Sequence, residues 1–136
     1  MLRAIDISTS GLIAQRQRMN TIAENIANVN TTVDANGKAV PFRRRFVTFS
    51  ADSDHVTDSR GAEVHYRVEV DQTTPLRRVH QPGHPQADGD GYVSYPNIKL
   101  IDEFVNAMDA SRAYQANIAS IEMIKEMANI NMRILA

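Results

Sequence analysis

Both ends of the chain carry long amphipathic patterns, and their length limits what the chain can fold into. Over residues 2–29, apolar side chains return at a heptad interval, which is typical of a helix that packs along its length against another helix. Residues 98–135 carry a second stripe of this kind. A helix of about 28 residues is roughly 42 Å long, so the short middle of the chain cannot bury both stripes. The stripes consist of Ile5, Leu12, Met19, Ile22 and Ile26, and of Tyr114, Ile118, Ile121, Ile124 and Leu135.

The stripes therefore predict that the terminal helices bury their apolar faces against each other or against copies of the chain. Apolar residues at helical spacing most often form the core of an ordinary helical domain. Here, a hairpin of the two helices would leave apolar positions of the second stripe in water, so we favour self-association or docking on a partner. Asn117 and Asn131 lie at seam positions, where a polar side chain sets the register of two helices.

The middle of the chain predicts a small β insert. Residues 64–70 alternate between apolar and polar side chains, which indicates a half-buried strand. Residues 42–50 show a broken strand pattern, and residues 76–79 are expected to be extended. The glycine- and proline-rich segment that follows is expected to be mostly irregular, and residues 51–61 are expected to form a loop. Asn-Gly at 36–37 signals a turn.

We thus predict a mainly α fold with a small β insert. The long N- and C-terminal helices pair as a coiled coil, and the middle is irregular and contains a β-hairpin. The expected segments are residues 1–32, 33–96 and 97–136, of which the first and the last form one helical domain. The final helix is expected to open at Pro96-Asn97, with Asp102 and Glu103 in its first turns.

Small and polar residues at 8–11 weaken the first helix, because glycine costs about 1 kcal/mol relative to alanine inside a helix. Two interpretations are open for Gly11. The helix starts late or frays there, or Gly11 permits close packing against a neighbouring helix.

Composition excludes several classes of protein. The formal net charge of −1 argues against nucleic-acid binding by bulk electrostatics. The chain contains no cysteine, which rules out disulfides and thiolate chemistry. No apolar run approaches the roughly 20 residues of a membrane span. The N-terminal residues lack the apolar core of a secretory signal peptide, so we expect a cytoplasmic protein or export by another signal.

Three patterns have possible chemistry, and each favours a plain interpretation. Arg43, Arg44 and Arg45 resemble a phosphate patch, but in a chain of balanced charge we expect them to dock on an acidic partner. Residues 88–91 place carboxylates at alternate positions, as calcium loops do, yet no closing glutamate follows, so a turn is favoured. The four histidines, which are His55, His65, His80 and His84, have no metal-ligand spacing. No nucleophile elbow, P-loop or dinucleotide fingerprint is present, so we predict no enzyme and no cofactor.

Several motifs resemble those of the bacterial flagellar rod and hook proteins, and together they cover nearly the whole chain. The rod-and-hook motif ANxxT occurs at Ala27, Asn28 and Thr31, within QRQRMNTIAENIANVNTT. SRAYQANIASIEMIKEM at 111–127 is similar to the helix that closes these proteins and contributes Gln115 and Asn117. PFRRRFVTF at 41–49 is similar to the PYRR segment of the family, and PGHPQADGDGYVSYPNI at 82–98 narrows the resemblance to the proximal-rod branch. Residues 33–40 depart from the family pattern.

The resemblance implies a structural subunit of the basal-body proximal rod. Such a subunit polymerises by packing its terminal helices, in the D0 arrangement of axial proteins, transmits torque and lines the export channel. The implied partners are copies of the chain, rod proteins of the FlgB, FlgF and FlgG types, the FliE-type adaptor and the flagellar type III export apparatus. The implied place is the rod in the periplasm, reached without a cleaved signal peptide. The motif residues, together with Tyr114, are implied contact or register positions.

Two other functions are open. A soluble helical adaptor would bind one amphipathic partner helix without polymerising. A metal- or phosphate-dependent enzyme is the third possibility, and it is the least supported by the residues.

Overall fold

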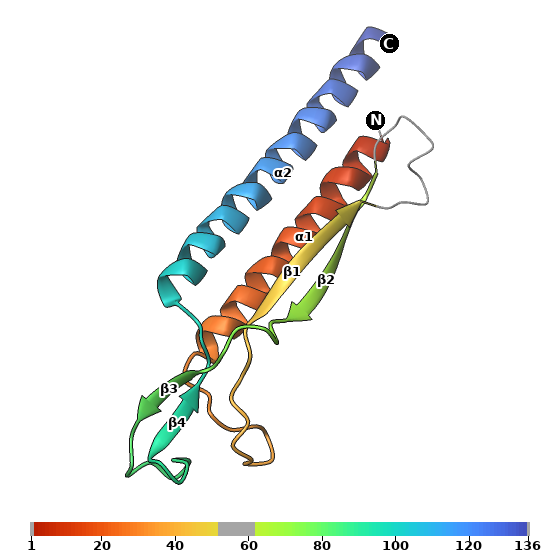
Figure 1. Ribbon diagram of the computed structural model, residues 1–136. Coiled ribbons are helices and arrows are strands. Elements are labelled where there is room, and N and C mark those ends of the chain that lie inside the picture. Colours follow the sequence, from red (N-terminus) through yellow and green to blue (C-terminus); the bar gives the residue numbers. More distant parts are fainter. Residues whose placement is uncertain (1, 52–61, 136) are drawn as a thin grey trace. The chain divides into compact units, whose positions relative to one another are not determined.

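The computed structural model describes residues 2–51 and 62–135, apart from the side chains of Leu2 and Leu135. In chain order the elements are α1 (Leu2–Ala27), β1 (Arg45–Ala51), β2 (Val64–Val70), β3 (Arg77–His80), β4 (Tyr92–Tyr95) and α2 (Leu100–Leu135) (Figure 1). Within this described part, β1 pairs with β2 and β3 pairs with β4. The predicted mainly α fold with a small β insert is confirmed. The predicted loop at 51–61 lies almost wholly outside the described residues, as does His55.

The chain divides into two compact units, and each draws on distant parts of the sequence. Unit 1 combines residues 1–19, 47–67 and 107–136, and unit 2 combines residues 20–46 and 68–106. In unit 1, the buried apolar residues among those described are Ala14 and Ala110, which are small. In unit 2 they are Ile22, Val93 and Ile98. The large apolar side chains therefore supply little of the buried interior of unit 1.

The first helix does not start late. It begins at Leu2 and continues through Gly11, and the Ser10 hydroxyl donates to the carbonyl of Ile7 at 2.8 Å. The same hydroxyl accepts the N–H of Val64 at 3.0 Å, which attaches the start of β2 to the helix. The small residues at 8–11 thus belong to an ordered helix, and the interpretation as a late start is wrong.

Gly11 instead permits a close approach between α1 and α2 in unit 1. A Cβ atom at Gly11 would lie 3.0 Å from Nδ2 of Asn117. A distance this short forces one of the two groups to move. The close-packing interpretation of Gly11 is confirmed at this position, although a full coiled coil between the helices stays a prediction.

We expect Gly11→Leu to lower the free energy of unfolding by about 1–3 kcal/mol, the usual cost of overpacking a tight contact. Gly11→Ala should be close to neutral, because a gain in helix propensity of about 1 kcal/mol opposes the shift of the Asn117 amide. Thermal unfolding of the three chains measures both effects. Adding Asn117→Ala to Gly11→Leu should restore part of the loss; a Gly11→Leu chain as stable as the original would contradict the contact.

The ANxxT motif ends α1. Asn28 Nδ2 donates at 2.9 Å to the carbonyl of Glu24, which also accepts the backbone N–H of Asn28 at 3.0 Å. Asn28 Oδ1 accepts the hydroxyl of Thr31 at 3.1 Å, and the Thr31 N–H donates to the carbonyl of Asn28. The Thr31 carbonyl then accepts the N–H of Phe42 at 3.0 Å. The motif therefore closes the helix and turns the chain toward residue 42.

The predicted strand at 64–70 is confirmed as β2, but its predicted half-burial is wrong. Tyr66, Val68 and Val70 are all exposed. A sheet buries one face only when a second layer covers it, and the sheet that contains β2 consists of β1 and β2 alone. The alternation of apolar residues therefore predicted the strand correctly, but it did not predict that the apolar face is left uncovered. The predicted turn at Asn36-Gly37 is confirmed by the positive φ of Gly37.

The segment after residue 79 is more regular than expected. β4 pairs antiparallel with β3, with Arg77 opposite Tyr95 and His80 opposite Tyr92. Val93 of β4 is 1% exposed, so this short strand contributes to the interior of unit 2. The strand was not predicted because the glycines and prolines nearby are typical of irregular segments. The final helix also begins later than expected, at Leu100, because Pro96 and Ile98 are buried in an extended segment.

Candidate assembly site

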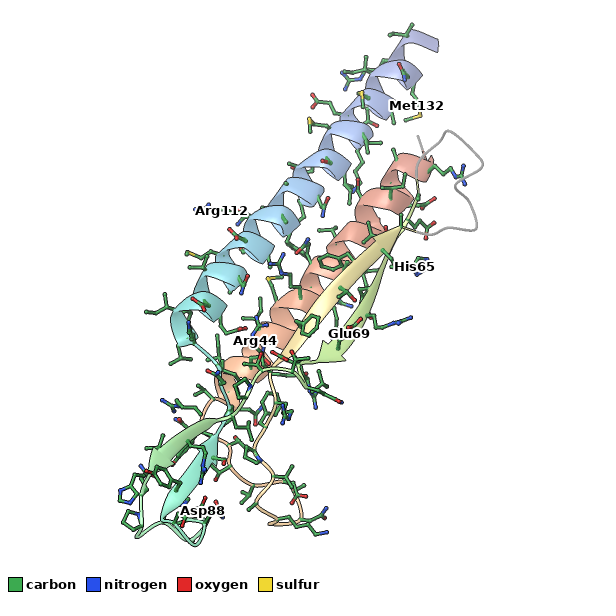
Figure 2. The ribbon with its side chains drawn as sticks, in the orientation of Figure 1. Arg44, His65, Glu69, Asp88, Arg112 and Met132 are labelled. Carbon is green, nitrogen blue, oxygen red and sulfur yellow. The ribbon has the colours of Figure 1, made fainter. Side chains whose placement is uncertain are left out.

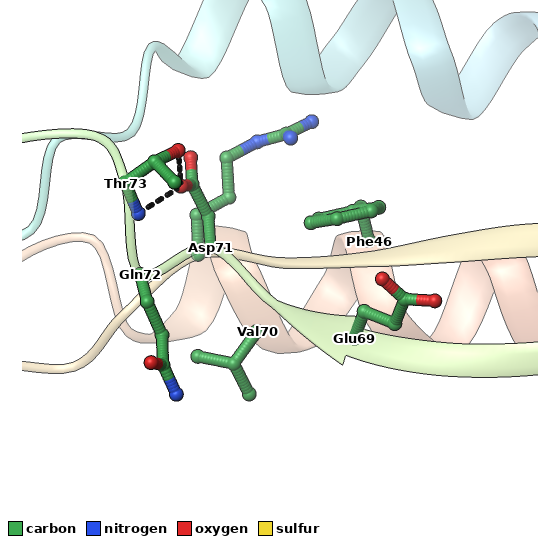
Figure 3. Close-up of a pocket in the computed structure, with 7 residues that line it drawn as sticks. Phe46, Glu69, Val70, Asp71, Gln72 and Thr73 are labelled. Carbon is green, nitrogen blue, oxygen red and sulfur yellow. Dashed lines mark hydrogen bonds between the residues drawn. The ribbon is translucent and has the colours of Figure 1, made fainter.

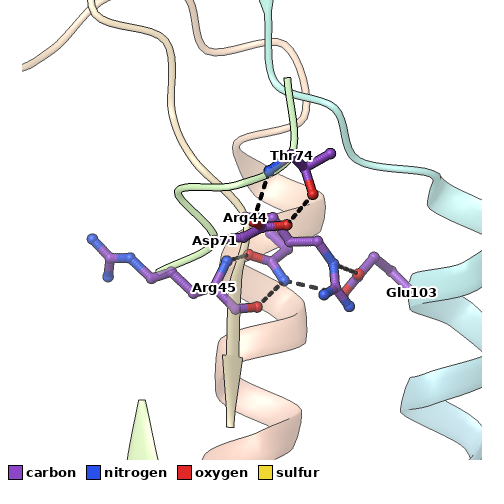
Figure 4. Close-up of polar contacts among 6 residues, drawn as sticks. Arg44, Arg45, Asp71, Thr74 and Glu103 are labelled. Carbon is purple, nitrogen blue, oxygen red and sulfur yellow. Dashed lines mark hydrogen bonds and ion pairs between the residues drawn. The ribbon is translucent and has the colours of Figure 1, made fainter. Parts of the chain in front are cut away.

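A buried carboxylate lies at the centre of unit 2. Glu103, in the first turn of α2, is 1% exposed. Its Oε1 accepts Nε of Arg44 at 2.7 Å, and its Oε2 accepts Nδ2 of Asn25 at 3.1 Å (Figure 4). A buried charge is tolerated when it is paired and hydrogen-bonded, and both conditions hold here.

Asn25 extends this network to the backbone of β1. The side chain is fully buried. Its Oδ1 accepts the N–H of Arg45 at 2.9 Å, and its Nδ2 also donates to the carbonyl of Arg45 at 2.7 Å. The Asn25 amide therefore makes the two backbone hydrogen bonds to Arg45 that a neighbouring strand would otherwise make. It also donates a hydrogen bond to Glu103. We call Asn25, Arg44, the backbone of Arg45, and Glu103 the polar junction; it joins the end of α1, the start of β1 and the start of α2 within unit 2.

The structure gives each of the three arginines partners within the chain. Arg44 pairs with Glu103, so its acidic partner lies in the same chain rather than in another protein. Arg45 pairs with Glu24 at 3.1 Å and stacks over the ring of Phe42. The Arg43 guanidinium faces the carbonyls of residues 71, 72 and 74 at 3.3–3.4 Å. Docking of this segment on an external acidic partner stays a prediction.

Asp71 builds a tight turn beside the polar junction. Its N–H donates to the Arg44 carbonyl at 2.8 Å. Its Oδ1 accepts the N–H and the hydroxyl of Thr73 and the N–H of Thr74, and its Oδ2 accepts the Thr74 hydroxyl (Figures 3 and 4). These hydrogen bonds, led by the Thr74 hydroxyl, hold the pKa of Asp71 well below its ordinary value of 3.8.

The pKa of Asp71 predicts a local pH dependence. Because the pKa is lower in the folded chain, ionised Asp71 adds stability above its ordinary pKa, and this contribution is lost as the pH falls below about 4. Asp71→Asn should therefore lower the melting temperature at pH 7 by more than at pH 2. Melting curves of both chains across this range measure the gap; a gap that widens at acid pH would contradict the turn.

The depression next to this turn has no catalytic arrangement. Its lining comprises Arg44, Phe46, Glu69, Val70, Asp71, Gln72 and Thr73 (Figure 3). Arg44 already pairs with Glu103, and both oxygens of Asp71 are occupied by the turn. Nothing in this set forms a pair of an acid and a base aimed at a shared point. The depression is the surface of a structural turn.

The predicted turn at residues 88–91 is confirmed. Asp88 Oδ1 accepts the N–H groups of Asp90 and Tyr92, at 3.1 and 2.8 Å, and Oδ2 pairs with Arg78. The backbone N–H of Tyr92 lowers the pKa of Asp88 most strongly. The carboxylate therefore closes the loop between β3 and β4. Across residues 2–51 and 62–135, no three His, Asp or Glu side chains gather as metal ligands.

The seam residues predicted from the stripes differ in exposure. Ile22 is buried in unit 2, and Ile118 in unit 1 is exposed. The side chain of Leu135 lies outside the described residues. The others, Ile5, Leu12, Met19, Ile26, Tyr114, Ile121 and Ile124, are half-buried. Of the motif positions, Asn117 is half-buried against Gly11, while Ala27 and Gln115 are exposed. The assembly role of these residues stays a prediction.

The start of α2 exposes large apolar side chains in unit 2. Leu100, Ile101, Phe104 and Val105 are all exposed, Ile101 to 77%. We call these four residues the N-terminal patch of α2. A groove beside it is lined by Val29, Asn30, Arg77, Ile98, Lys99, Leu100, Ile101 and Asp102. Because contiguous exposed apolar side chains are typical of interaction surfaces, this patch is a candidate for one.

Sequence reasoning missed the polar junction. A polar residue at position 25, between Ile22 and Ile26 of the first stripe, was the available signal. Its partner Glu103 lies 78 residues away and was interpreted as a helix-dipole residue. Neither residue alone indicated the pairing.

Comparison with protein families identifies the class of protein to which this chain belongs. Residues 5–33 match the family model described as flagella basal body rod protein. Residues 90–132 match the model described as flagellar basal body rod FlgEFG protein C-terminal. Both ends of the chain thus carry the signature of a flagellar basal-body rod protein, which is a structural protein and not an enzyme.

The relatives narrow this class further. The flagellar basal-body rod protein FlgC of Salmonella typhimurium is 38% identical over 127 residues, which cover 93% of this chain and 92% of that protein. FlgC of Escherichia coli O157:H7 is 37% identical over the same share of each chain. FlgC of Aquifex aeolicus is 35% identical over 93% of this chain and 91% of that protein. The chain belongs to the FlgC family of flagellar basal-body rod proteins.

Proposed function

We propose that this chain is a subunit of the proximal rod and that it polymerises by packing its terminal helices against those of neighbouring subunits. The family assignment supports the first part. The exposed apolar residues of α2 support the second, and they are the observation that carries it. The apolar residues of the N-terminal patch stay in water in the single chain, where each large apolar side chain forgoes on the order of 1.5–3 kcal/mol of burial.

The predicted seam supplies the packing surface. Ile5, Leu12 and Met19 of α1 would face Tyr114, Ile121 and Ile124 of α2 in a neighbouring subunit. In the assembled rod, the paired helices would line the export channel and the β strands would face neighbours. The polar junction would hold the C-terminal end of α1 and the N-terminal end of α2 in one arrangement. Torque would then pass through a defined structure rather than a flexible one.

The family assignment supports a set of proposed partners. They are further copies of the chain, rod proteins of the FlgB, FlgF and FlgG types, and the FliE-type adaptor. The proposed location is the basal body, with the rod in the periplasm, after export through the flagellar type III apparatus. Neither described helix is long and apolar enough to cross a membrane.

The test is the mass and shape of the purified chain, alone and with rod proteins from the same genome. Analytical ultracentrifugation and electron microscopy should show ladders of oligomers or short filaments when the partners are mixed. A saturable one-to-one complex without longer species would favour the helical adaptor and overturn the proposal.

A further inference from the structure

We propose that the N-terminal patch of α2 receives the C-terminal end of α2 from a second copy of this chain. The occupying surface is a stripe in unit 1 formed by Met123, Met127, Ile130 and Ile134, which we call the C-terminal stripe of α2. This inference rests on the proposed rod function and names which two surfaces meet.

The C-terminal stripe has the form of an apolar ridge. Its four residues are spaced by four, three and four positions, so they share one face of the helix. All four are exposed, from 49% for Ile130 to 75% for Ile134. Met132, labelled near the same end of α2 in Figure 2, is exposed as well, but it lies on the opposite side of the helix from the stripe.

The shape of the N-terminal patch suits such a ridge. The groove beside it has Val29, Ile98, Leu100 and Ile101 as apolar lining. Methionine has a flexible, unbranched side chain that fills irregular apolar gaps. Met123 and Met127 are therefore suitable side chains to enter a groove whose walls come from a turn and a helix start.

The charges at the two surfaces are complementary. Arg77, Lys99 and Asp102 line the groove, which gives this rim an excess of one positive charge. Glu122, Glu126 and Arg133 flank the C-terminal stripe on one side, which gives that flank an excess of one negative charge. Opposite charges around an apolar centre favour docking and fix its direction. A patch that met another patch would instead place like charges together.

Two different surfaces of one chain make a heterologous contact, because each copy offers a free patch and a free stripe to the next. Such contacts build rings or open helical polymers rather than closed dimers. This property agrees with a rod subunit and distinguishes the proposed contact from a symmetric pairing.

The absence of cysteine makes a direct test possible. Ile101→Cys and Met127→Cys are introduced together at the native locus of the bacterium that makes this protein, and isolated basal bodies are treated with a short bismaleimide. We expect a ladder of cross-linked copies in the double variant. Each single variant should yield no cross-linked copies, and neither should Asp90→Cys combined with Ile101→Cys, because Asp90 is exposed on the loop between β3 and β4.

Other outcomes overturn the inference. Dimers from Ile101→Cys alone would show that patches meet each other. Cross-links to another rod protein only, or none in cells that swim, would reject the contact while leaving the proposed rod function in place. Rods that still form in cells from which the gene for this chain has been deleted would instead reject the function. As a second measurement, Lys99→Glu and Glu126→Lys should each reduce the ladder at least twofold, and the pair together should restore it.

Discussion

Replacing Glu103 with alanine is expected to lower the free energy of unfolding by about 3 kcal/mol. Breaking a buried ion pair usually costs about 3–5 kcal/mol, because the remaining partner is left desolvated. Arg44 is 33% exposed and can recover some hydration, so the lower end of this range applies. Asn25 is fully buried and would lose one acceptor for its amide, which adds to the cost. Urea unfolding followed by circular dichroism, at one protein concentration, measures the change.

The chain contains a matched control for this experiment. Glu24 forms an ion pair with Arg45 in the same unit, but both side chains are nearly half exposed. Glu24→Ala should therefore change stability by no more than about 0.5–1 kcal/mol. Glu103→Gln keeps the volume and one acceptor, and should fall between the two. Equal losses for Glu24→Ala and Glu103→Ala would show that burial of the polar junction contributes nothing.

Replacing Ile121 with aspartate is expected to abolish assembly and motility while leaving expression intact. Ile121 is half-buried on the predicted seam of α2. Aspartate there would put a charge into an apolar contact between helices, where an unpaired charge is strongly unfavourable. The effect is expected on assembly because the seam is proposed to close between subunits. Swimming on soft agar and the count of rods in isolated basal bodies measure it.

Asn129→Asp is the control, since Asn129 is exposed and lies on the charged flank of α2, three residues after Glu126 and four before Arg133. This variant introduces the same charge on the same helix, outside the C-terminal stripe, and should assemble normally. Normal motility of the Ile121→Asp strain would remove Ile121 from the seam. Loss of motility in both strains would show that any new charge on this helix is harmful, and would leave the seam unsupported.

Periodicity and turn chemistry carried the prediction of the elements. The stripe at one end led to α1, the stripe at the other end led to α2, and alternation at 64–70 led to β2. These signals are local, because a helix or strand repeats its own spacing within a few residues. β4 was not predicted, because only four residues form it and the neighbouring loop is rich in glycine and proline.

The partners of individual side chains were beyond such signals. Arg44 in a run of three arginines looked like a surface charge, and Glu103 looked like a residue chosen for the helix dipole. Their ion pair depends on bringing residue 44 beside residue 103, which only the folded chain does. The same holds for Gly11, whose two interpretations were equal until Asn117 lay against it.

The sequence by itself determined the two long helices, the small β insert and, through its motifs, the rod family. It did so because hydrophobic spacing and family motifs are properties of contiguous residues. The tertiary structure alone decided that Glu103 is buried with Asn25 and Arg44. It also decided that both carboxylate oxygens of Asp71 accept hydrogen bonds within a turn, and that β2 has no covered face. These features depend on which distant segments meet, and on what is left in water when they do; no local pattern encodes that outcome.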